Sequence, residues 1–268
     1  MRTGHRGHSP ACAADRTLIF AHRGASYRAP ENTLSAFRLA RDMGADGIEL
    51  DVQLSRDGVP VVIHDATVDR TTDGSGTVAD LTLAELKRLD AGSWFSSEFA
   101  GERIPTLNEV FSVRRTDGTA VGQDLSLNLE LKVVETEAVG LEEAVGSLIA
   151  RCGMEDRVLI SSFSPLALQR MRRVNYHLPL ALIYGLSLPQ AELERWVQEL
   201  QPLAALHPEH RLVDEAHLAW AWERNCRVNV WTVDELEETQ RLLTLGVDGL
   251  FTNQPDLLKA ILKEEPTR

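Results

Sequence analysis

The feature that most constrains the fold is a regular alternation between two hydrophobic patterns. Short apolar runs rich in Val, Ile, Leu and Phe alternate with longer segments of helical periodicity almost to the end of the chain. This alternation is typical of an α/β protein in which helices connect the parallel strands of a sheet or a barrel. The expected strands are Leu18–His22, Gly47–Val52, Val59–His64, Ser126–Lys132, Val158–Phe163, Leu180–Tyr184, Ala204–His207, Arg227–Thr232 and Gly249–Thr252. The expected helices are Thr33–Met43, Thr106–Arg115, Val139–Cys152, Pro165–Val174, Pro189–Leu200, Asp214–Asn225, Val233–Leu245 and Pro255–Leu262.

The count of expected elements is one strand too many for a (β/α)8 TIM barrel. The run Val59–His64 follows Gly47–Val52 after only QLSRDG, which is too short for a parallel crossover and suits an antiparallel hairpin. We therefore predict a barrel with a small insertion subdomain, residues 53–105, between strand 2 and helix 2. The insertion contains turn-rich TTDGSG and the short helix LTLAELKRLD.

The length of 268 residues also fits a single α/β barrel. We predict a flexible N-terminal tail over residues 1–16 and one barrel domain over residues 17–268. A doubly wound parallel sheet is the structural alternative, because it has the same alternation of strands and helices.

Charge and cysteine content narrow the classes of partner. The chain has 28 basic and 40 acidic residues, a formal net charge of −12, and no run of Lys and Arg interrupts the acidity. Nucleic acid is therefore not an expected partner, and an anionic small-molecule substrate would need a local cationic centre such as a metal ion. Cys12, Cys152 and Cys226 are odd in number and far apart, which indicates reduced thiols rather than disulfides or a zinc site.

The apolar runs are too short for targeting or membrane segments. Residues 1–16 lack the apolar core of a signal peptide, and no stretch approaches the roughly 20 apolar residues of a membrane span. We therefore expect a cytoplasmic protein without stable membrane insertion.

Carboxylates stand at the ends of two expected strands, where the catalytic groups of such barrels lie. Glu49 and Asp51 are two residues apart in GIELDV, so both side chains point to one side of the strand, into the barrel. Glu130 and Lys132 repeat this spacing in LNLELK. Three inward carboxylates are costly unless a cation joins them, and oxygen ligands alone suit Mg²⁺ or Ca²⁺. Surface acids, or ion pairs with Lys132, are the simpler alternative for one pair, but two pairs on separate strands favour a metal site.

Two histidines also end expected strands. His22 ends LIFAH and His64 ends PVVIH. A lone histidine at a strand end is usually packed or hydrogen-bonded. A pair beside a carboxylate cluster can instead supply a general base and a general acid on the two sides of a reacting phosphorus.

Two cationic side chains complete the expected site. Arg23 offers a planar donor for phosphate oxygens, and Lys132 offers a point charge. The alternative for Arg23 is a salt bridge to Glu31 or Glu49.

Seven segments of the chain together resemble one known family. The segments AHRGAS, APENTLSAF, GADGIELDVQLSRDGVPVVIHD, LNLELK, VLISSFSP, VNVWTVD and LGVDGLFTNQPD resemble the glycerophosphodiester phosphodiesterase family, in its cytosolic bacterial type. The resemblance runs from about Leu18 to Leu262, and the order of the segments is specific. It implies a (β/α)8 barrel whose insertion follows the second strand. It also implies a divalent cation on Glu49, Asp51 and Glu130, acid–base catalysis by His22 and His64, and a phosphate held by Arg23 and Lys132.

The reaction that the resemblance implies is hydrolysis of a glycerophosphodiester, such as glycerophosphocholine or glycerophosphoethanolamine, to sn-glycerol 3-phosphate and an alcohol. The nucleophile would be either the substrate's own 2-hydroxyl or water, and the sequence leaves open which histidine is the base. Phe163 and Trp231, near strand ends, would form an apolar wall of the pocket or pack in the core. His207 is a further candidate for a contact with a substrate hydroxyl.

Two other functions fit parts of the sequence. A lysophospholipase D-like enzyme would show an exposed apolar rim or a membrane helix near the barrel mouth, and Trp94, Phe95 and Phe99 of the insertion are compatible with a rim. A catalytically silent metal- or ligand-binding barrel would not need two histidines beside three carboxylates.

The tripeptide His-Arg-Gly occurs twice near the N-terminus. His22-Arg23-Gly24 follows an apolar strand, whereas His5-Arg6-Gly7 has no strand before it and no helix after it. We interpret the first occurrence, residues 5–7, as coincidence.

Overall fold

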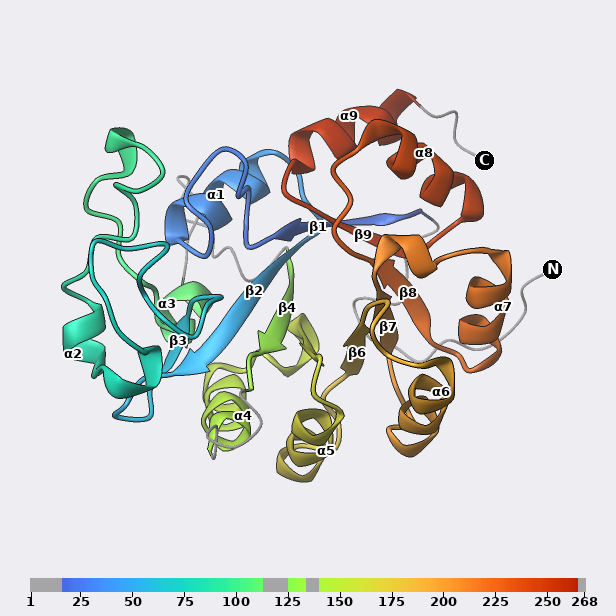
Figure 1. Ribbon diagram of the computed structural model, residues 1–268, viewed down its shortest axis with the longest axis horizontal. Coiled ribbons are helices and arrows are strands. Elements are labelled where there is room, and N and C mark those ends of the chain that lie inside the picture. Colours follow the sequence, from blue (N-terminus) through green and yellow to red (C-terminus); the bar gives the residue numbers. More distant parts are fainter. Residues whose placement is uncertain (1–15, 113–124, 134–139, 265–268) are drawn as a thin grey trace.

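The computed structural model describes residues 16–112, 125–133 and 140–264. Within these residues, eight parallel strands form a closed ring, in which β1 pairs with both β2 and β9. Figure 1 shows this ring with its helices around it. The closed ring confirms the TIM barrel and excludes the doubly wound sheet. The strands, in order around the ring, are β1 (Leu18–His22), β2 (Gly47–Leu54), β4 (Ser126–Leu131), β5 (Val158–Ser162), β6 (Leu180–Tyr184), β7 (Ala205–Pro208), β8 (Arg227–Val230) and β9 (Gly249–Thr252).

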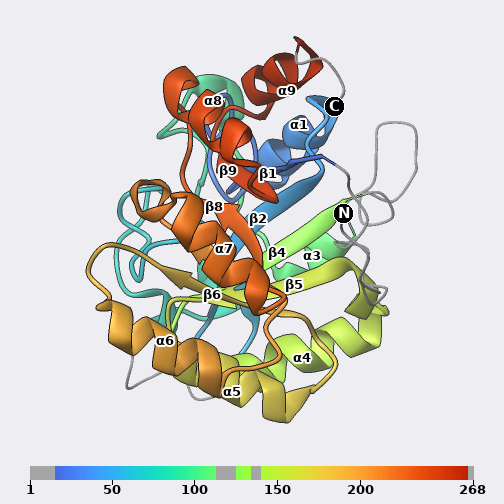
Figure 2. The ribbon, with the colours of Figure 1, turned by 90° about the vertical axis from the view of Figure 1, so that its right-hand side faces the viewer.

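The helices lie outside the ring in both ribbon views (Figures 1 and 2). The helices are α1 (Leu34–Asp42), α2 (Leu83–Leu86), α3 (Leu107–Phe111), α4 (Leu141–Cys152), α5 (Pro165–Val174), α6 (Gln190–Glu199), α7 (Glu215–Glu223), α8 (Leu236–Leu245) and α9 (Pro255–Glu264). Except for α2, which belongs to the insertion, their apolar faces pack against the strands in one large buried cluster.

Helix starts follow the capping residues in the sequence. The Thr33 side chain accepts a hydrogen bond from the Ala36 amide at the start of α1. Ser164 caps α5, whose first residue is a proline, and Thr106 forms a capping box with Glu109 at the start of α3.

The extra strand and the insertion lie beside the ring. β3 (Pro60–Val62) pairs antiparallel with β2, with Val52 opposite Val62, which confirms the hairpin expected from the short connection. Figure 1 shows the insertion, in teal, on the outer side of β2 and β3. It has an apolar core of its own, formed by Val61, Ile63, Val68, Val78, Leu86, Ala91 and Ile104. α2 lies within it, where LTLAELKRLD predicted a short helix.

Several elements are shorter than expected at the pocket end. The expected strands to Lys132, Phe163 and Thr232 end one or two residues earlier, at Leu131, Ser162 and Val230. The expected strand Val59–His64 shrinks to Pro60–Val62, which places His64 in a loop.

The helix expected from Val233 begins only at Leu236. The Val233 amide bonds to the Phe251 carbonyl at 2.8 Å, so this segment remains extended beside β9. α3 ends at Phe111, whereas the expected helix ran to Arg115; residues 113–115 lie outside the described residues.

Two expectations concern the chain before β1. His5-Arg6-Gly7 lies outside the described residues. Arg16, the last residue of the expected tail, pairs with Asp46 through two hydrogen bonds of 2.7 and 2.5 Å. In the part of the chain that the structure describes, every helix is too short or too polar to cross a bilayer.

Candidate active site

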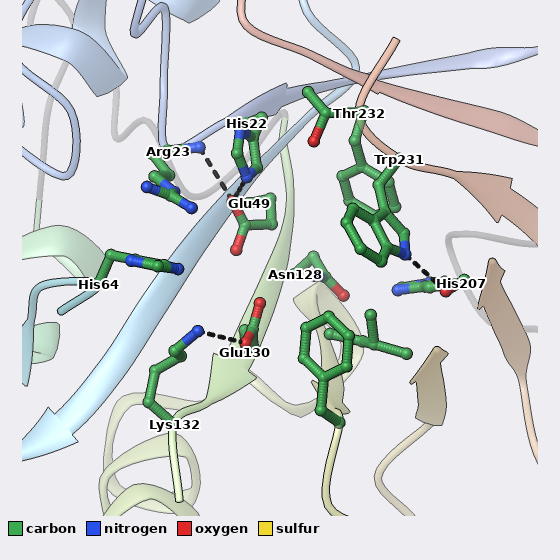
Figure 3. Close-up of a pocket in the computed structure, with 13 residues that line it drawn as sticks. His22, Arg23, Glu49, His64, Asn128, Glu130, Lys132, His207, Trp231 and Thr232 are labelled. Atoms are coloured by element: carbon green, nitrogen blue, oxygen red, sulfur yellow. Dashed lines mark hydrogen bonds and ion pairs between the residues drawn. The ribbon is translucent and has the colours of Figure 1, made fainter. Parts of the chain in front are cut away.

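A cavity of about 150 Å³ lies where the expected site residues meet. One side is polar and is lined by His22, Arg23, Glu49, His64, Asn128, Glu130 and Lys132. The other side is largely apolar and is lined by Phe163, Ile183, His207, Trp231, Thr232 and Phe251. Figure 3 shows both histidines of the polar side pointing toward the glutamates. Apart from Asp51, which lies directly behind this surface, every expected site residue lines the cavity.

The three carboxylates lie together, as their spacing predicted. Parallel pairing of β2 with β4 places Asp51 opposite Glu130, and Glu49 opposite Asn128. One oxygen from each of Glu49, Asp51 and Glu130 lies within 4.8 Å of the others. Glu49 and Asp51 are 4% and 1% exposed, so the alternative of surface acids is wrong.

The charge of this cluster is only partly balanced. Lys132 Nζ lies 2.8 Å from Glu130 Oε1 and 3.6 Å from Asp51 Oδ1. Arg23 Nε lies 3.4 Å from Asp51 Oδ2. The ion pairs with Lys132 that the alternative envisaged therefore exist. Within the described part of the chain, Glu49 accepts a hydrogen bond from one group, the Arg23 backbone amide at 2.9 Å on Oε2.

The electrostatics show the cost of this arrangement. Burial, and then the charges of Asp51 and Glu130, raise the pKa of Glu49 well above its usual range. Burial and the charge of Asp51 raise the pKa of Glu130 to about 7. Burial opposes the charge of Lys132, but the carboxylates of Glu130 and Asp51 outweigh it and raise the pKa of the ammonium.

The oxygen atoms of this carboxylate cluster fit a hard divalent cation. Glu49 Oε1 and Asp51 Oδ1 are buried and have no hydrogen-bond partner among the described residues. A buried carboxylate oxygen without a donor is unfavourable, and a cation would satisfy both of these oxygens at once. Three carboxylates with no nitrogen or sulfur ligand suit Mg²⁺ or Ca²⁺.

His22 is held by an amide that directly follows the last strand of the ring. Its Nδ1 lies 2.8 Å from Asn253 Oδ1, and Asn253 Nδ2 donates to Asp234 Oδ2 at 2.5 Å. Since Asp234 only accepts, the Asn253 oxygen must face the ring, and His22 Nδ1 carries the proton. His22 Nε2 is then left as the acceptor, 4.0 Å from Glu49 Oε2. Burial, with the neighbouring Arg23 charge, lowers the pKa of His22, which favours the neutral ring.

His64 is held by a carboxylate. Its Nδ1 lies 2.6 Å from Asp65 Oδ1, which fixes the orientation of the ring and places a proton on Nδ1. The loop that carries it is anchored to β2, because the Gln53 amide nitrogen lies 2.7–3.1 Å from the carbonyl oxygens of Ile63, His64 and Asp65. The two histidines therefore have partners of different charge.

The turn that follows β1 requires the glycine of the tripeptide His22-Arg23-Gly24. Arg23 and Gly24 both have positive φ, 56° and 84°. A Cβ on Gly24 would lie 2.7 Å from Ala36 Cβ and 2.8 Å from the Ala36 carbonyl carbon, so only glycine fits against α1. This turn directs the Arg23 amide to Glu49. The Arg23 guanidinium lies 2.9 Å from Glu31, and this contact is the salt bridge that the sequence suggested as an alternative.

The largely apolar side contains the expected aromatic wall. Phe163 and Trp231 pack edge to face, with ring centroids 5.5 Å apart. His207 is 1% exposed, and burial lowers its pKa to about 3, so it is neutral. His207 Nε2 lies 3.1 Å from the Asn229 amide nitrogen and accepts from it, which makes Nδ1 the protonated nitrogen.

Several residues of the site were missed from the sequence, among them Asn128 and Asn253. Asn128 is two residues before Glu130 on β4, so the same period-2 argument would have found it. Asn253 lies in a loop, 231 residues from the histidine that it holds, and no local signal marks it.

Known proteins share this arrangement of elements. The sequence model of the glycerophosphoryl diester phosphodiesterase family matches residues 22–257, most of the chain. The chain belongs to the glycerophosphoryl diester phosphodiesterase family. It is therefore an enzyme, a phosphoric diester hydrolase.

Relatives of the glycerophosphoryl diester phosphodiesterase family match over nearly their whole length. A glycerophosphodiester phosphodiesterase of Caldanaerobacter subterraneus subsp. tengcongensis is 42% identical over 251 residues, which are 93% of this chain and 99% of that protein. One from Bacillus subtilis is 32% identical over an alignment of 263 residues that covers 93% of this chain and 87% of that protein. A solved Oleispira antarctica phosphodiesterase, in complex with the product sn-glycerol-3-phosphate, has a TM-score of 0.84 and 33% identity, covering 93% of this chain and 98% of that chain.

Proposed function

We propose that this enzyme hydrolyses glycerophosphodiesters such as glycerophosphocholine and glycerophosphoethanolamine to sn-glycerol 3-phosphate and an alcohol, with a divalent cation and two histidines. The observation that carries the proposal is the position of His22 and His64 on the rim of a buried three-carboxylate cluster. A relative in the same family was solved with sn-glycerol-3-phosphate as its product. The chemistry of the pocket suits that product.

The cation would be Mg²⁺ or Ca²⁺ on Glu49, Asp51 and Glu130, where it would neutralise charge on the phosphate oxygens. Arg23 and Lys132 line the same pocket and would hold the remaining phosphate oxygens. Arg23 and Lys132 already have carboxylate partners, so the phosphate would share these two side chains with the carboxylates.

The partners of the two histidines support different roles. His22 is paired with a neutral amide and has an unprotonated Nε2, so it would act as the base. His64 is paired with the Asp65 carboxylate, a partner of charge opposite to that of an imidazolium, so it would act as the acid.

In the proposed reaction, His22 takes the proton of the attacking hydroxyl, whose oxygen bonds to phosphorus. The bond from phosphorus to the alcohol oxygen breaks, and His64 gives its proton to that oxygen. When the attacking group is the glycerol 2-hydroxyl, the product is a cyclic phosphate. Water then opens this ring while the histidines exchange roles. When water attacks directly, sn-glycerol 3-phosphate forms in one step. Transient accumulation of the cyclic phosphate separates the two routes.

The decisive experiment is incubation of the purified enzyme with glycerophosphocholine, with Mg²⁺, with Ca²⁺ and with a chelator, while sn-glycerol 3-phosphate is measured. We expect release with at least one cation and none with the chelator. Absence of release with both cations would refute the proposed substrate, and undiminished release with the chelator would refute the metal.

A second substrate class is favoured by exposed apolar side chains on the face of the barrel that carries the cavity. They lie in the segments that follow the carboxyl ends of five strands: Tyr27, Phe163, Leu166, Leu186, Leu236 and Leu257. Such residues would suit the acyl chain of a lysophospholipid held in the same pocket. In the insertion, Phe95 packs edge to face against both Trp94 and Phe99, and none of these three residues lines the cavity.

The comparison of lysophosphatidylcholine with glycerophosphocholine tests this second substrate. A lysophospholipase D activity predicts a higher kcat/KM for the lipid, and Leu186→Ser should lower that value without changing the value for glycerophosphocholine. Equal loss on both substrates would remove the acyl chain from this surface.

A further inference from the structure

Arg70, a residue of the insertion, joins two carboxylates that lead to opposite parts of the site. Its Nε and Nη2 donate to Asp65 at 2.7 and 3.1 Å. Its Nη1 and Nη2 donate to Glu31 at 2.9 and 2.8 Å. A single guanidinium therefore binds each carboxylate through two hydrogen bonds, the geometry in which arginine differs most from lysine. We call Arg70 with Asp65 and Glu31 the Arg70 clamp.

Each carboxylate of the Arg70 clamp also contacts a residue of the proposed chemistry. Asp65 accepts from His64 at 2.6 Å, and Glu31 accepts from Arg23 at 2.9 Å. Arg70 itself does not line the cavity. It is thus one step away from the proposed acid and one step away from a proposed phosphate ligand.

The Arg70 clamp also connects two parts of the chain. Arg70 and His64 belong to the insertion, whereas Glu31 and Arg23 lie in the segment between β1 and α1. The insertion packs around an apolar core of its own, to which the Arg70 side chain does not contribute.

Removal of Arg70 should affect Asp65 and Glu31 differently. Hydrogen bonds from Arg70 hold Asp65 against His64 and keep the pKa of Asp65 well below its usual range, and without them Asp65 loses its fixed orientation. Glu31 would lose its other arginine and pair with Arg23 alone, which would withdraw the Arg23 guanidinium from a phosphate.

We propose that Arg70 is a positioning residue that orients His64 through Asp65 and shares Glu31 with Arg23, so that the acid and the phosphate ligand take up their working positions together. The proposal rests on the roles proposed above for His64 and Arg23. It assigns a catalytic purpose to the insertion, which holds one histidine in register with the barrel.

The test compares Arg70→Met and Arg70→Lys with wild type on two substrates. With glycerophosphocholine we expect kcat to fall about 10- to 100-fold in Arg70→Met and KM to rise, the scale seen when residues that orient active-site ligands are removed. Arg70→Lys keeps the charge but not the paired geometry and should recover only part of the loss. With the p-nitrophenyl ester of sn-glycerol 3-phosphate, whose leaving group departs without a proton, kcat should fall much less.

The matched control is Arg56→Met. Arg56 also lies in the inserted segment and pairs with Glu85 at 3.3 Å, but it has no contact with the site. We expect wild-type kinetics for this variant. Thermal unfolding of each variant shows whether any loss of activity reflects loss of the fold.

A double-mutant cycle tests the route through Asp65. In an Asp65→Asn background, Arg70→Met should cause little further loss of kcat, because the residue through which it acts has already been changed. Full additivity, or equal losses on the two substrates, would overturn the proposal.

His64→Ala, measured in parallel, separates this proposal from the proposed function. An inactive His64→Ala beside an unimpaired Arg70→Met would overturn the positioning role alone. A fully active His64→Ala would overturn the role of the histidine, and the positioning role with it.

Discussion

The neutral histidine in the pocket makes the stability of the fold depend on pH in a way that can be calculated. Burial lowers the pKa of His207 to about 3, against about 6.5 in an unfolded chain. Below about pH 6.5 the unfolded chain binds a proton that the folded protein does not. The contribution of His207 to stability is therefore complete above that pH and is lost as the pH falls toward about 3.

The magnitude follows from these two pKa values. Each pH unit between them costs about 1.4 kcal/mol of unfolding free energy, so acidification from about pH 7 to about pH 5 should cost about 2 kcal/mol through this residue alone. In His207→Gln the side chain can still accept from Asn229 but does not titrate. The variant will be less stable at neutral pH, because it loses the ring contact with Phe251 at 4.9 Å, but its stability should depend less on pH.

The assay is urea unfolding followed by tryptophan fluorescence at about pH 7, 6 and 5, in the presence of a chelator. Titration of other groups is common to both proteins and cancels in the difference. The difference in unfolding free energy between wild type and His207→Gln should shrink by about 2 kcal/mol over this range. His177→Gln, which removes an exposed histidine, is the control and should leave the wild-type pH dependence in place. Parallel curves for wild type and His207→Gln would refute a neutral buried His207.

Three further outcomes are expected. His22→Ala and His64→Ala should each lower kcat at least about 100-fold, with unchanged circular dichroism, and near-normal turnover would remove that residue from the mechanism. Mg²⁺ or Ca²⁺ should raise the Tm of wild type but not that of Asp51→Asn, and equal shifts would place the ion elsewhere. Gly24→Ala should lower the unfolding free energy by at least about 2 kcal/mol in urea titrations, because its Cβ would overlap Ala36 at a positive φ; a smaller loss would mean that α1 shifts freely.

The sequence predicts the parts of this site that depend on strand geometry. The spacing of two residues placed Glu49 and Asp51 on one face, and the parallel register then brought Glu130 beside them. The short connection after β2 identified the antiparallel strand β3. These predictions succeed because the period of a strand and the length of a connection are local properties.

The partners of the histidines could not be predicted in this way. Arg70 and Glu31 are 39 residues apart, and Asn253 reaches His22 across the closure of the ring. Such contacts depend on where loops fold back over the barrel, and neither periodicity nor spacing encodes that position. Asn128 has the spacing of two residues from Glu130, but its amide is uncharged, so its presence in a strand did not by itself indicate a site.

The two sides of the cavity come from different halves of the gene product. The polar side is formed by residues between His22 and Lys132, and it contains every ionisable group of the cavity lining except His207. The largely apolar side is formed by residues between Phe163 and Phe251. Exchange of the loops after β5 to β7 would therefore reshape one side of the substrate pocket while every residue of the proposed acid–base and metal chemistry stays in place. In a barrel with this division, the range of accepted substrates can change through these loops, while the residues proposed to break the phosphorus–oxygen bond stay the same.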